Sequence, residues 1–309
     1  MLVRQALREY RTWAFDSRRW DHYRPRAGDI VISTYPKCGT TWTQRIVGLL
    51  IFQDPAPLPL MDISAWIDRR IPEPIEAVIQ RIESQTHRRF LKSHIPADGL
   101  PLYDEVRYIH VARDGRDACM SFHNHGTGYS SQILALMDRA GEEDESIGRP
   151  YPRTPADPAA HFHSWLTEAV VPGQGDGIPA MSFFEFERSW WDLRDRANVL
   201  MVHYNDLKAD LPGQIGRIAE FLDIDVPENL LPRFVEAAGF DAMRRDGSTL
   251  LAKAAMTFQD GSDRFFHKGS NRRWQGVYAA DDLALYDAKV AALPPNCRHW
   301  VENGGAIRD

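Results

Sequence analysis

The sequence predicts an α/β fold: a single domain with a mostly parallel central sheet flanked by helices. Short apolar runs typical of buried strands alternate with segments of helical periodicity along the 309-residue chain. The first apolar run is followed by a tight loop that opens a helix, as in a strand–loop–helix unit. Because no linker rich in serine and glycine divides the chain, we expect one domain over residues 1–309.

The expected strands are short and apolar, and they are residues 30–33, 89–93, 106–112 and 199–204. Helices are expected from Trp42 to Phe52, directly after the third strand, and at about 213–222, where apolar residues recur at helical spacing. The segment 141–158 is acidic and then rich in proline, which predicts a surface loop, with a substrate lid as the alternative. Its acidic residues 142–145 are expected to face solvent.

Charge and cysteine content exclude several classes of protein. The chain has 37 Lys and Arg against 43 Asp and Glu, a net charge of −6, and no long basic tract. We therefore expect no nucleic-acid partner, and an anionic ligand must meet a local cluster of cations. Cys38, Cys119 and Cys297 lie far apart, which disfavours a disulfide framework and a zinc site. Since no stretch approaches the roughly 20 apolar residues of a membrane span and no signal-peptide pattern is present, we expect a cytoplasmic protein without membrane contact.

The loop after the first strand, residues 35–42, combines features that suit a phosphate or sulfate. Lys37 adds a positive charge, Thr40 and Thr41 add hydroxyl donors, and the helix that follows presents backbone N–H groups at its N-terminus. It is not a Walker A loop, because its lysine precedes the glycine, and this disfavours an ATPase or kinase. The alternative is a plain strand-to-helix turn with a solvated lysine.

This loop, Tyr-Pro-Lys-Cys-Gly-Thr-Thr-Trp, resembles the 5′-phosphosulfate loop of the cytosolic sulfotransferases. These enzymes use 3′-phosphoadenosine 5′-phosphosulfate (PAPS) as sulfuryl donor and release 3′-phosphoadenosine 5′-phosphate (PAP). The resemblance implies a P-loop-like phosphosulfate loop on a nucleotide-kinase-like fold. It also implies donor contacts from Lys37, Cys38, Gly39, Thr40 and Thr41, with Cys38 where serine is usual.

The third strand leads into Arg113, with Ser121 eight residues further on, and this resembles the family's 3′-phosphate segment. A guanidinium at a strand end offers a bidentate fork to phosphate, and a serine hydroxyl can donate to the same group. The alternative is that Arg113 pairs with Asp114 or Asp117 nearby.

Lys92 and His94 lie two residues apart in an extended segment, so their side chains are expected to point to the same side. The segment Lys-Ser-His-Ile-Pro is similar to the family's Lys-Thr-His-Leu-Pro. The resemblance implies that His94 is the general base and that Lys92 and Lys37 act as cations at the sulfuryl group.

A fourth match lies near the C-terminus, in residues 265–274. It implies donor contacts from His267, Lys268 and Gly269. His267 replaces the usual arginine, which predicts a weaker hold on the 3′-phosphate unless Arg272 or Arg273 substitutes for it. For the adenine, the resemblance implies three aromatic residues, since a purine presents a face for stacking; they are Trp42, Tyr204 and Phe240.

Together these motifs predict a PAPS-dependent sulfotransferase that acts on a hydroxyl of a small, apolar or aromatic acceptor. The loops 53–88, 123–160 and 240–264 are expected to wall the acceptor pocket, with the aromatic residues Trp66, Tyr129 and Phe258 among them. The alternatives are a diverged P-loop-type kinase and a non-catalytic nucleotide-binding module.

We expect no metal site, because the pairs at 123 and 125 and at 161 and 163 place histidines two apart in helical segments, on different faces. His123 and His125 are instead candidates for the acceptor pocket. The oligomeric state stays open, since the segment after Trp274 does not match the family's dimerisation segment.

Overall fold

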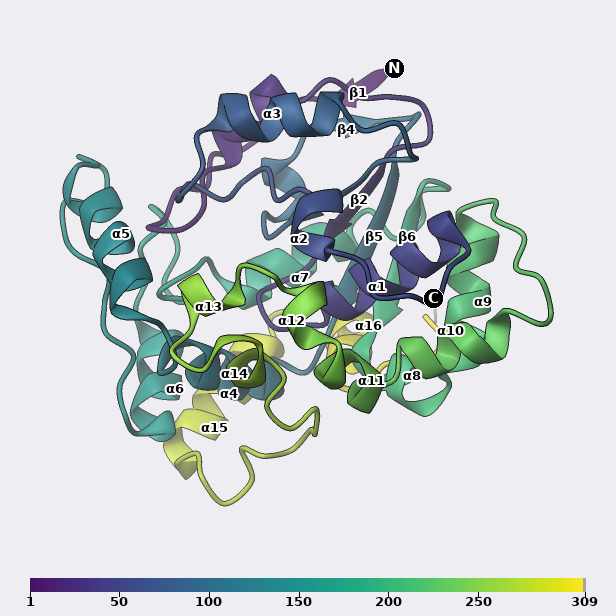
Figure 1. Ribbon diagram of the computed structural model, residues 1–309. Helices are drawn as coiled ribbons and strands as arrows, with labels where there is room; N and C mark the ends of the chain where they lie inside the picture. The colour runs from purple at the N-terminus through teal and green to yellow at the C-terminus, as the bar shows by residue number, and fades with distance from the viewer. Residues whose placement is uncertain (308–309) are drawn as a thin grey trace.

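The computed structural model describes residues 1–307 and has a four-stranded parallel sheet at its centre (Figure 1). The strand order is β3 (Phe90–Ser93), β2 (Ile30–Ser33), β5 (Arg107–Ala112) and β6 (Val199–His203). All four expected strands are present, each within one residue of its expected bounds. The predicted fold class is confirmed. A separate antiparallel pair joins β1 (Leu2–Arg4) to β4 (Leu102–Tyr103).

The chain changes direction across the sheet at β2. From β2 it moves outward to β3, and it then crosses back to β5 and β6 on the other side. The register pairs Ile32 with Lys92 on one side and with Ile109 on the other. In open parallel sheets, ligands bind beyond the carboxyl ends of the strands at such a switch point. The loop after β2 therefore lies where a ligand is expected.

Neighbouring residues of each central strand pack against helices on opposite faces of the sheet. Ile30, Ile32 and Val111 belong to one apolar cluster with α1 (Thr40–Phe52), α9 (Leu211–Phe221) and α10 (Leu231–Ala237). Val31 and Met201 belong to another, with α7 (Phe183–Trp191) and α16 (Pro295–Asn303). Because both faces are covered, most residues of these strands are apolar, which explains why the sequence identifies them.

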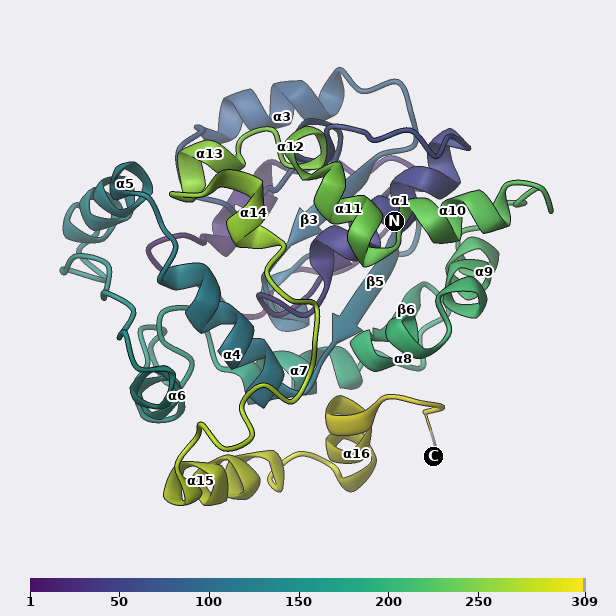
Figure 2. The same cartoon turned by 60° about the horizontal axis from the view of Figure 1, so that its bottom comes forward.

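The remaining helices surround this core (Figures 1 and 2). They are η1 (Ser17–His22), α2 (Leu60–Ile63), α3 (Ile75–Glu83), η2 (Ala97–Gly99), α4 (Gly115–Gly126), α5 (Ser131–Glu142), α6 (Pro158–Thr167), α8 (Tyr204–Ala209), α11 (Phe240–Arg245), α12 (Gly247–Leu250), α13 (Ala254–Thr257), α14 (Gly261–Phe265) and α15 (Ala280–Val290). None of the helices in residues 1–307 has the length and apolar character needed to cross a membrane. Tyr204, expected at a strand end, instead begins α8.

The loop expected at 141–158 is present between α5 and α6, but its acidic residues are not all solvated. Asp144 is buried and forms ion pairs with Arg11 and with Arg70, the latter at 2.9 Å. The expectation of a fully exposed acidic face is therefore wrong at Asp144, because this carboxylate ties the loop to the N-terminal region.

Candidate functional site

One cavity of about 850 Å³ lies at the carboxyl ends of the central strands, and all four strands contribute to it. Lys37 follows β2, His94 follows β3, Arg113 follows β5 and Tyr204 follows β6, and each of them lines the cavity. The site is therefore built from segments far apart in the sequence that the parallel sheet brings to one edge.

Nearly all of the site residues expected from the sequence line this cavity. They are Lys37, Gly39, Thr40, Thr41, Trp42, Lys92, His94, Arg113, Ser121, Tyr204, Phe240, His267, Lys268 and Gly269. Cys38 is the exception. Its side chain is fully buried in the core, and its backbone N–H donates to the Tyr35 carbonyl. The Cys38 thiol therefore does not reach the cavity, and a donor contact from Cys38 stays a prediction.

The β2–α1 loop turns sharply because two of its residues adopt a left-handed backbone. Lys37 has φ 73° and Gly39 has φ 111°, and Gly39 is the N-cap of α1 without a side-chain cap. A Cβ at Gly39 would lie 3.2 Å from Cδ2 of Tyr204, so the loop also passes close to this ring. The first N–H groups of α1 are left open to a ligand, at the positive end of the helix dipole.

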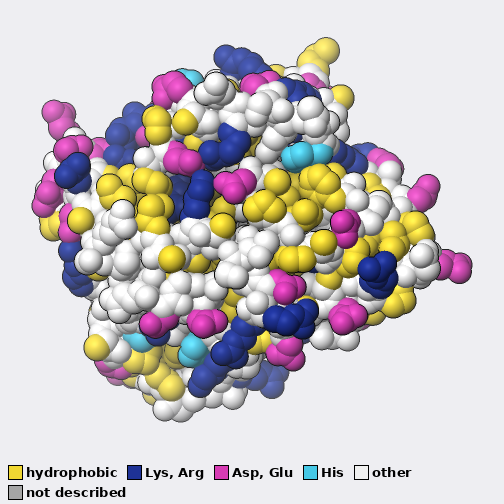
Figure 3. Space-filling view, viewed as in Figure 1, with side chains coloured by type: hydrophobic (Ala, Val, Ile, Leu, Met, Phe, Trp, Pro, Cys, Tyr) yellow, Lys and Arg dark blue, Asp and Glu magenta, His cyan; other side chains and the backbone are white. Residues whose placement is uncertain are grey.

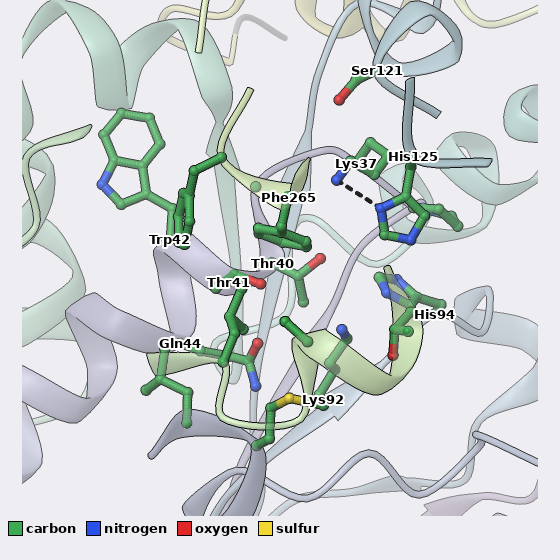
Figure 4. Close-up of a pocket in the computed structure, with 18 of the residues that line it drawn as sticks. Lys37, Thr40, Thr41, Trp42, Gln44, Lys92, His94, Ser121, His125 and Phe265 are labelled. Carbon is green, nitrogen blue, oxygen red and sulfur yellow. Dashed lines mark hydrogen bonds between the residues drawn. The ribbon is translucent and has the colours of Figure 1, made fainter. Parts of the chain in front are cut away.

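The Lys37 ammonium lies inside the cavity, 3.3 Å from Nδ1 of His125 and 4.2 Å from the centre of the Phe265 ring (Figure 4). Burial, with the nearby charges of Lys92 and Arg113, lowers the pKa of Lys37 to about 7. Burial also holds the pKa of His125 well below its usual range, so this histidine is neutral and accepts the hydrogen bond from Lys37. An anion is the ligand that would favour the charged form of Lys37.

The Arg113 guanidinium does not pair with Asp114 or Asp117. It donates to Oδ1 of Asn271 at 2.7 Å and to the Lys37 carbonyl at 3.2 Å, while its Nε is buried without a partner. Its Cζ also lies 4.1 Å from the centre of the Tyr204 ring. The alternative of a local ion pair is therefore wrong, and Arg113 links the β2–α1 loop to the C-terminal motif.

His94 is held by two hydrogen bonds at the end of β3. Its Nδ1 lies 2.7 Å from the Thr34 carbonyl, and its backbone N–H donates to Oδ2 of Asp68 at 3.0 Å. Because a carbonyl can only accept, Nδ1 carries the proton, and the other ring nitrogen, Nε2, has a free lone pair. Burial and the charge of Lys92 hold the pKa of His94 well below its usual range, so the ring is neutral.

Lys92 and His94 share the Trp66 ring as a neighbour. The Lys92 ammonium lies 4.0 Å from the ring centre, and the His94 ring lies edge-on to it with 4.9 Å between centroids. Burial and the charge of Arg69 lower the pKa of Lys92 to about 7. Figure 4 shows Lys37, Lys92, His94 and His125 converging on the same part of the cavity.

The C-terminal motif contributes Arg273 as well as His267. Arg273 lines the cavity, and its guanidinium donates to Nδ1 of His267 at 3.3 Å. Burial and the charge of Arg273 lower the pKa of His267, so a neutral imidazole stands beside a charged guanidinium. Arg272 does not line the cavity; its backbone N–H donates to Oδ1 of Asp117 at 2.6 Å. Of the two arginines considered, only Arg273 reaches the site.

Only one of the two histidines expected in the acceptor pocket reaches it. His125 lines the cavity, whereas His123 accompanies His161 at 5.5 Å between ring centroids and bonds to the Pro155 carbonyl. The expectation for His123 is wrong because positions 123 and 125 lie on different faces of α4. Within residues 1–307, no three His, Cys, Asp or Glu side chains are placed to hold a metal ion.

The charge of the cavity is opposite to that of the whole chain. Nine Lys or Arg residues line it, against a single described carboxylate, Glu73. Three buried donors on its wall, Arg81 Nε, Arg113 Nε and Trp42 Nε1, have no hydrogen-bond partner within residues 1–307. Trp42 and Tyr204 meet edge-on at 5.4 Å, and the Phe240 ring is 38% exposed. The site therefore fits an anion that also presents an aromatic ring. On the face drawn in Figure 3, acidic and basic side chains are interspersed.

Comparison with known proteins identifies the family. The sulfotransferase-domain family matches residues 27–282. The chain belongs to this family. The resemblance inferred from four motifs is thereby confirmed, and the protein is a sulfotransferase. The kinase and non-catalytic alternatives are not favoured.

Relatives match this sulfotransferase over most of their length. It is 33% identical to a glycolipid sulfotransferase of Mycobacterium tuberculosis, covering 96% of this chain and 94% of the relative. It is 25% identical to sulfotransferase 1B1 of Mus musculus, covering 89% and 86%.

Two solved structures share its fold. Mouse sulfotransferase SULT7A1 complexed with PAP has a TM-score of 0.66 at 18% identity, covering 88% of this chain and 86% of that one. Retinol dehydratase in complex with androsterone and inactive cofactor PAP has a TM-score of 0.64 at 19% identity, covering 89% and 82%.

The three aromatic residues expected in the acceptor pocket lie on the wall of the same cavity. Trp66, Tyr129 and Phe258 all line it, and Tyr129 stacks on Phe258 at 5.9 Å between centroids. Sequence reasoning missed Asp68, which accepts hydrogen bonds from the His94 backbone and from the Trp66 indole at 2.8 Å. No local motif marks it, because its partners are brought to it only by the fold.

Proposed function

We propose that this sulfotransferase transfers the sulfuryl group of PAPS to a hydroxyl of a small, apolar or aromatic acceptor, with His94 as general base. The observation that carries the proposal is the His94 ring: its Nδ1 proton is engaged by the Thr34 carbonyl, and the ring lines the cavity. A neutral imidazole with its Nε2 lone pair free can accept a proton from an acceptor hydroxyl.

PAPS supplies the activated sulfuryl group and its nucleotide leaving group. In our proposal, the 3′-phosphate is held by Arg113, Ser121 and Lys268, with Arg273 in place of the usual arginine and His267 neutral beside it. The support is their common position on the cavity wall and the unpaired Nε of Arg113.

The 5′ end is assigned to the open N–H groups of the β2–α1 loop with the hydroxyls of Thr40 and Thr41. Trp42, Tyr204 and Phe240 are the surfaces for adenine, and Gly269 passes close enough to the Phe240 ring to hold it: a Cβ at Gly269 would lie 2.7 Å from Cδ2 of Phe240.

His94 Nε2 removes the proton of the acceptor hydroxyl as this oxygen attacks sulfur. Lys37 and Lys92 meet the negative charge that develops on the transferred group and on the leaving oxygen, which their buried position strengthens. Asp68 fixes the backbone of His94, so the ring is oriented before the acceptor binds. No step of this scheme requires a metal.

We assign the class of acceptor from the side chains that line this part of the cavity. The mycobacterial relative is named for glycolipids, which combine hydroxyl groups with an apolar part. In this chain, aromatic and aliphatic side chains, among them Phe15, Met137 and Tyr151, line the acceptor side. Such a wall favours a hydroxylated molecule with an apolar or aromatic body.

The test combines donor preference with an acceptor screen. Thermal shift with PAP is compared with ATP plus magnesium, and PAPS labelled with ³⁵S is then offered with phenols, aliphatic alcohols and amines. We expect stabilisation by PAP and label transfer to hydroxyl compounds. Preference for ATP, or label on amines alone, would contradict the proposal.

A further inference from the structure

On the acceptor side of the cavity, the Arg69 side chain has no ion-pair or hydrogen-bond partner within residues 1–307. Four charged residues line this side, namely Arg69, Glu73, Arg81 and Lys253. Arg81 donates twice to Glu73, at 3.0 and 3.1 Å, and Lys253 lies 3.5 Å from the same carboxylate and 3.2 Å from Asp62. Arg81 and Lys253 are therefore both paired with carboxylates, those of Glu73 and Asp62. For the Arg69 guanidinium, the described part of the chain provides neither a hydrogen-bond acceptor nor an ion-pair partner.

Arg69 stands close to the proposed site of transfer. Its Cζ lies 5.2 Å from the centre of the Trp66 ring, and the His94 ring lies 4.9 Å from the same indole. The guanidinium and the proposed general base therefore neighbour the same indole. A ligand that spans this indole can place one end at His94 and the other at Arg69.

The Arg69 guanidinium is half-buried on the cavity wall, so it loses part of its hydration without gaining a protein partner. Burial lowers the pKa of Arg69, opposed only by the fields of Tyr129 and of Glu73, whose carboxylate already binds Arg81 and Lys253. A planar guanidinium presents five donors in a fork that matches a carboxylate or a phosphate. An anion from the ligand is the group that would compensate this charge.

We propose that the acceptor is a hydroxy acid: its anionic group binds the Arg69 guanidinium while its hydroxyl lies at His94 and its apolar body packs on Trp66. The inference rests on the proposed function, and it narrows the acceptor from any apolar hydroxyl compound to one that carries a negative charge. A carboxylate, a phosphate or a sulfate ester would present the same chemistry to Arg69.

The experiment compares acceptors that differ only in charge. The probes are 4-hydroxybenzoate, 4-hydroxyphenylacetate and 3-(4-hydroxyphenyl)propionate, each with its neutral amide, so that the distance from hydroxyl to carboxylate is also varied. Phenyl phosphate and phenyl sulfate, each with phenol as the neutral partner, compare the other anions. Binding of each probe is measured by calorimetry on the PAP-saturated protein. Because PAP occupies the proposed donor site, the anionic probes cannot bind to the cations that hold the nucleotide phosphates. Wild type is compared with Arg69→Gln, which loses the charge, and Arg69→Lys, which keeps it; PAP affinity reports a folded donor site in each.

We expect wild type to bind at least one anion roughly 10- to 100-fold more tightly than its neutral partner. This preference should fall to about one in Arg69→Gln and persist in part in Arg69→Lys. Equal binding of every anion and its neutral partner by wild type, or an unchanged preference in Arg69→Gln, overturns the inference. Equal binding would point to an acceptor that offers neutral hydroxyls to Arg69.

Label transfer from PAPS separates this result from the proposed function. If Arg69-dependent anion preference is measured while no hydroxylated probe that binds receives label, the proposed function fails and the assignment of Arg69 stands. If neutral amides are labelled as readily as the acids, the proposed function stands and the hydroxy-acid assignment fails.

Discussion

At the scale of single residues, the role proposed for His94 follows from the hydrogen bond that one of its two ring nitrogens makes. The Thr34 carbonyl holds the proton on Nδ1, so only Nε2 is available as a base. We predict that His94→Ala lowers turnover by roughly 10²- to 10⁴-fold, about 3–5 kcal/mol of barrier, because the hydroxyl proton then has no acceptor. PAP affinity should change little.

The control is His163→Ala, since His163 is a surface histidine paired with Asp282. Single-turnover rates with labelled PAPS measure both variants. A His94→Ala protein within threefold of wild type would remove this ring from the mechanism.

Lys37 makes donor binding depend on pH. Its pKa lies at about 7 in the free protein, and its charged form is the one that binds an anion. Affinity for PAP should therefore be full below pH 7 and fall as pH rises through this value, by at least about tenfold between pH 7 and pH 9. Calorimetry above pH 7 avoids the titration of the nucleotide's own phosphate. Lys37→Arg should reduce the slope, because a guanidinium stays charged; a flat profile in wild type would contradict the lowered pKa of Lys37.

Arg273 and Arg272 are adjacent in the sequence but differ in whether they reach the cavity. Arg273 lines the cavity, whereas Arg272 does not. We expect Arg273→Ala to weaken PAP binding roughly 10- to 100-fold, since a charge-assisted contact to phosphate is lost. Arg272→Ala is the matched control and should stay within about threefold, because no phosphate contact is removed. If the two variants bind PAP alike, the 3′-phosphate is held elsewhere.

At the scale of elements, the β2–α1 loop depends on its glycine. Gly39→Ala places a Cβ against Tyr204 in a left-handed backbone, so we expect a loss of about 1–3 kcal/mol in unfolding free energy together with weaker PAP binding. Gly216, inside α9, is the control: nothing lies near its position, and Gly216→Ala should gain roughly 0.5–1 kcal/mol. Urea unfolding measures both variants. Unchanged stability in Gly39→Ala would show that the loop tolerates a side chain.

The four central strands and the helices α1, α4 and α9 could be predicted from the sequence, and the short helices α11 to α14 could not. The central strands contribute apolar residues to the clusters on both faces of the sheet, and α1 carries an apolar stripe, so both leave a clear local pattern. The helices α11 to α14 have four to six residues each, too few to show a period of 3.6. They form part of the cavity wall, and their place is set by packing on α1 and α2 through Trp42 and Leu60.

At the scale of the whole molecule, the sequence identified the donor motifs and could not identify the partners of each side chain. Arg113 has carboxylates one and four residues away but bonds to Asn271, far along the chain. Arg69 lies in no recognised motif. It has no partner within residues 1–307 because Glu73 is already paired with Arg81 and Lys253. The partners of both arginines depend on contacts between segments that are distant in the sequence, and a local sequence pattern does not contain this information.

The walls proposed to bind donor and acceptor belong to one continuous cavity, with Lys37 and His94 both facing it. Donor and acceptor can therefore be present together, and the acceptor oxygen can reach sulfur without an intermediate carrier on the enzyme. This has a kinetic signature. Double-reciprocal plots of initial rate against acceptor concentration, taken at several fixed PAPS concentrations, should give intersecting lines. Parallel lines would mean that the sulfuryl group is bound covalently to a side chain between two half-reactions.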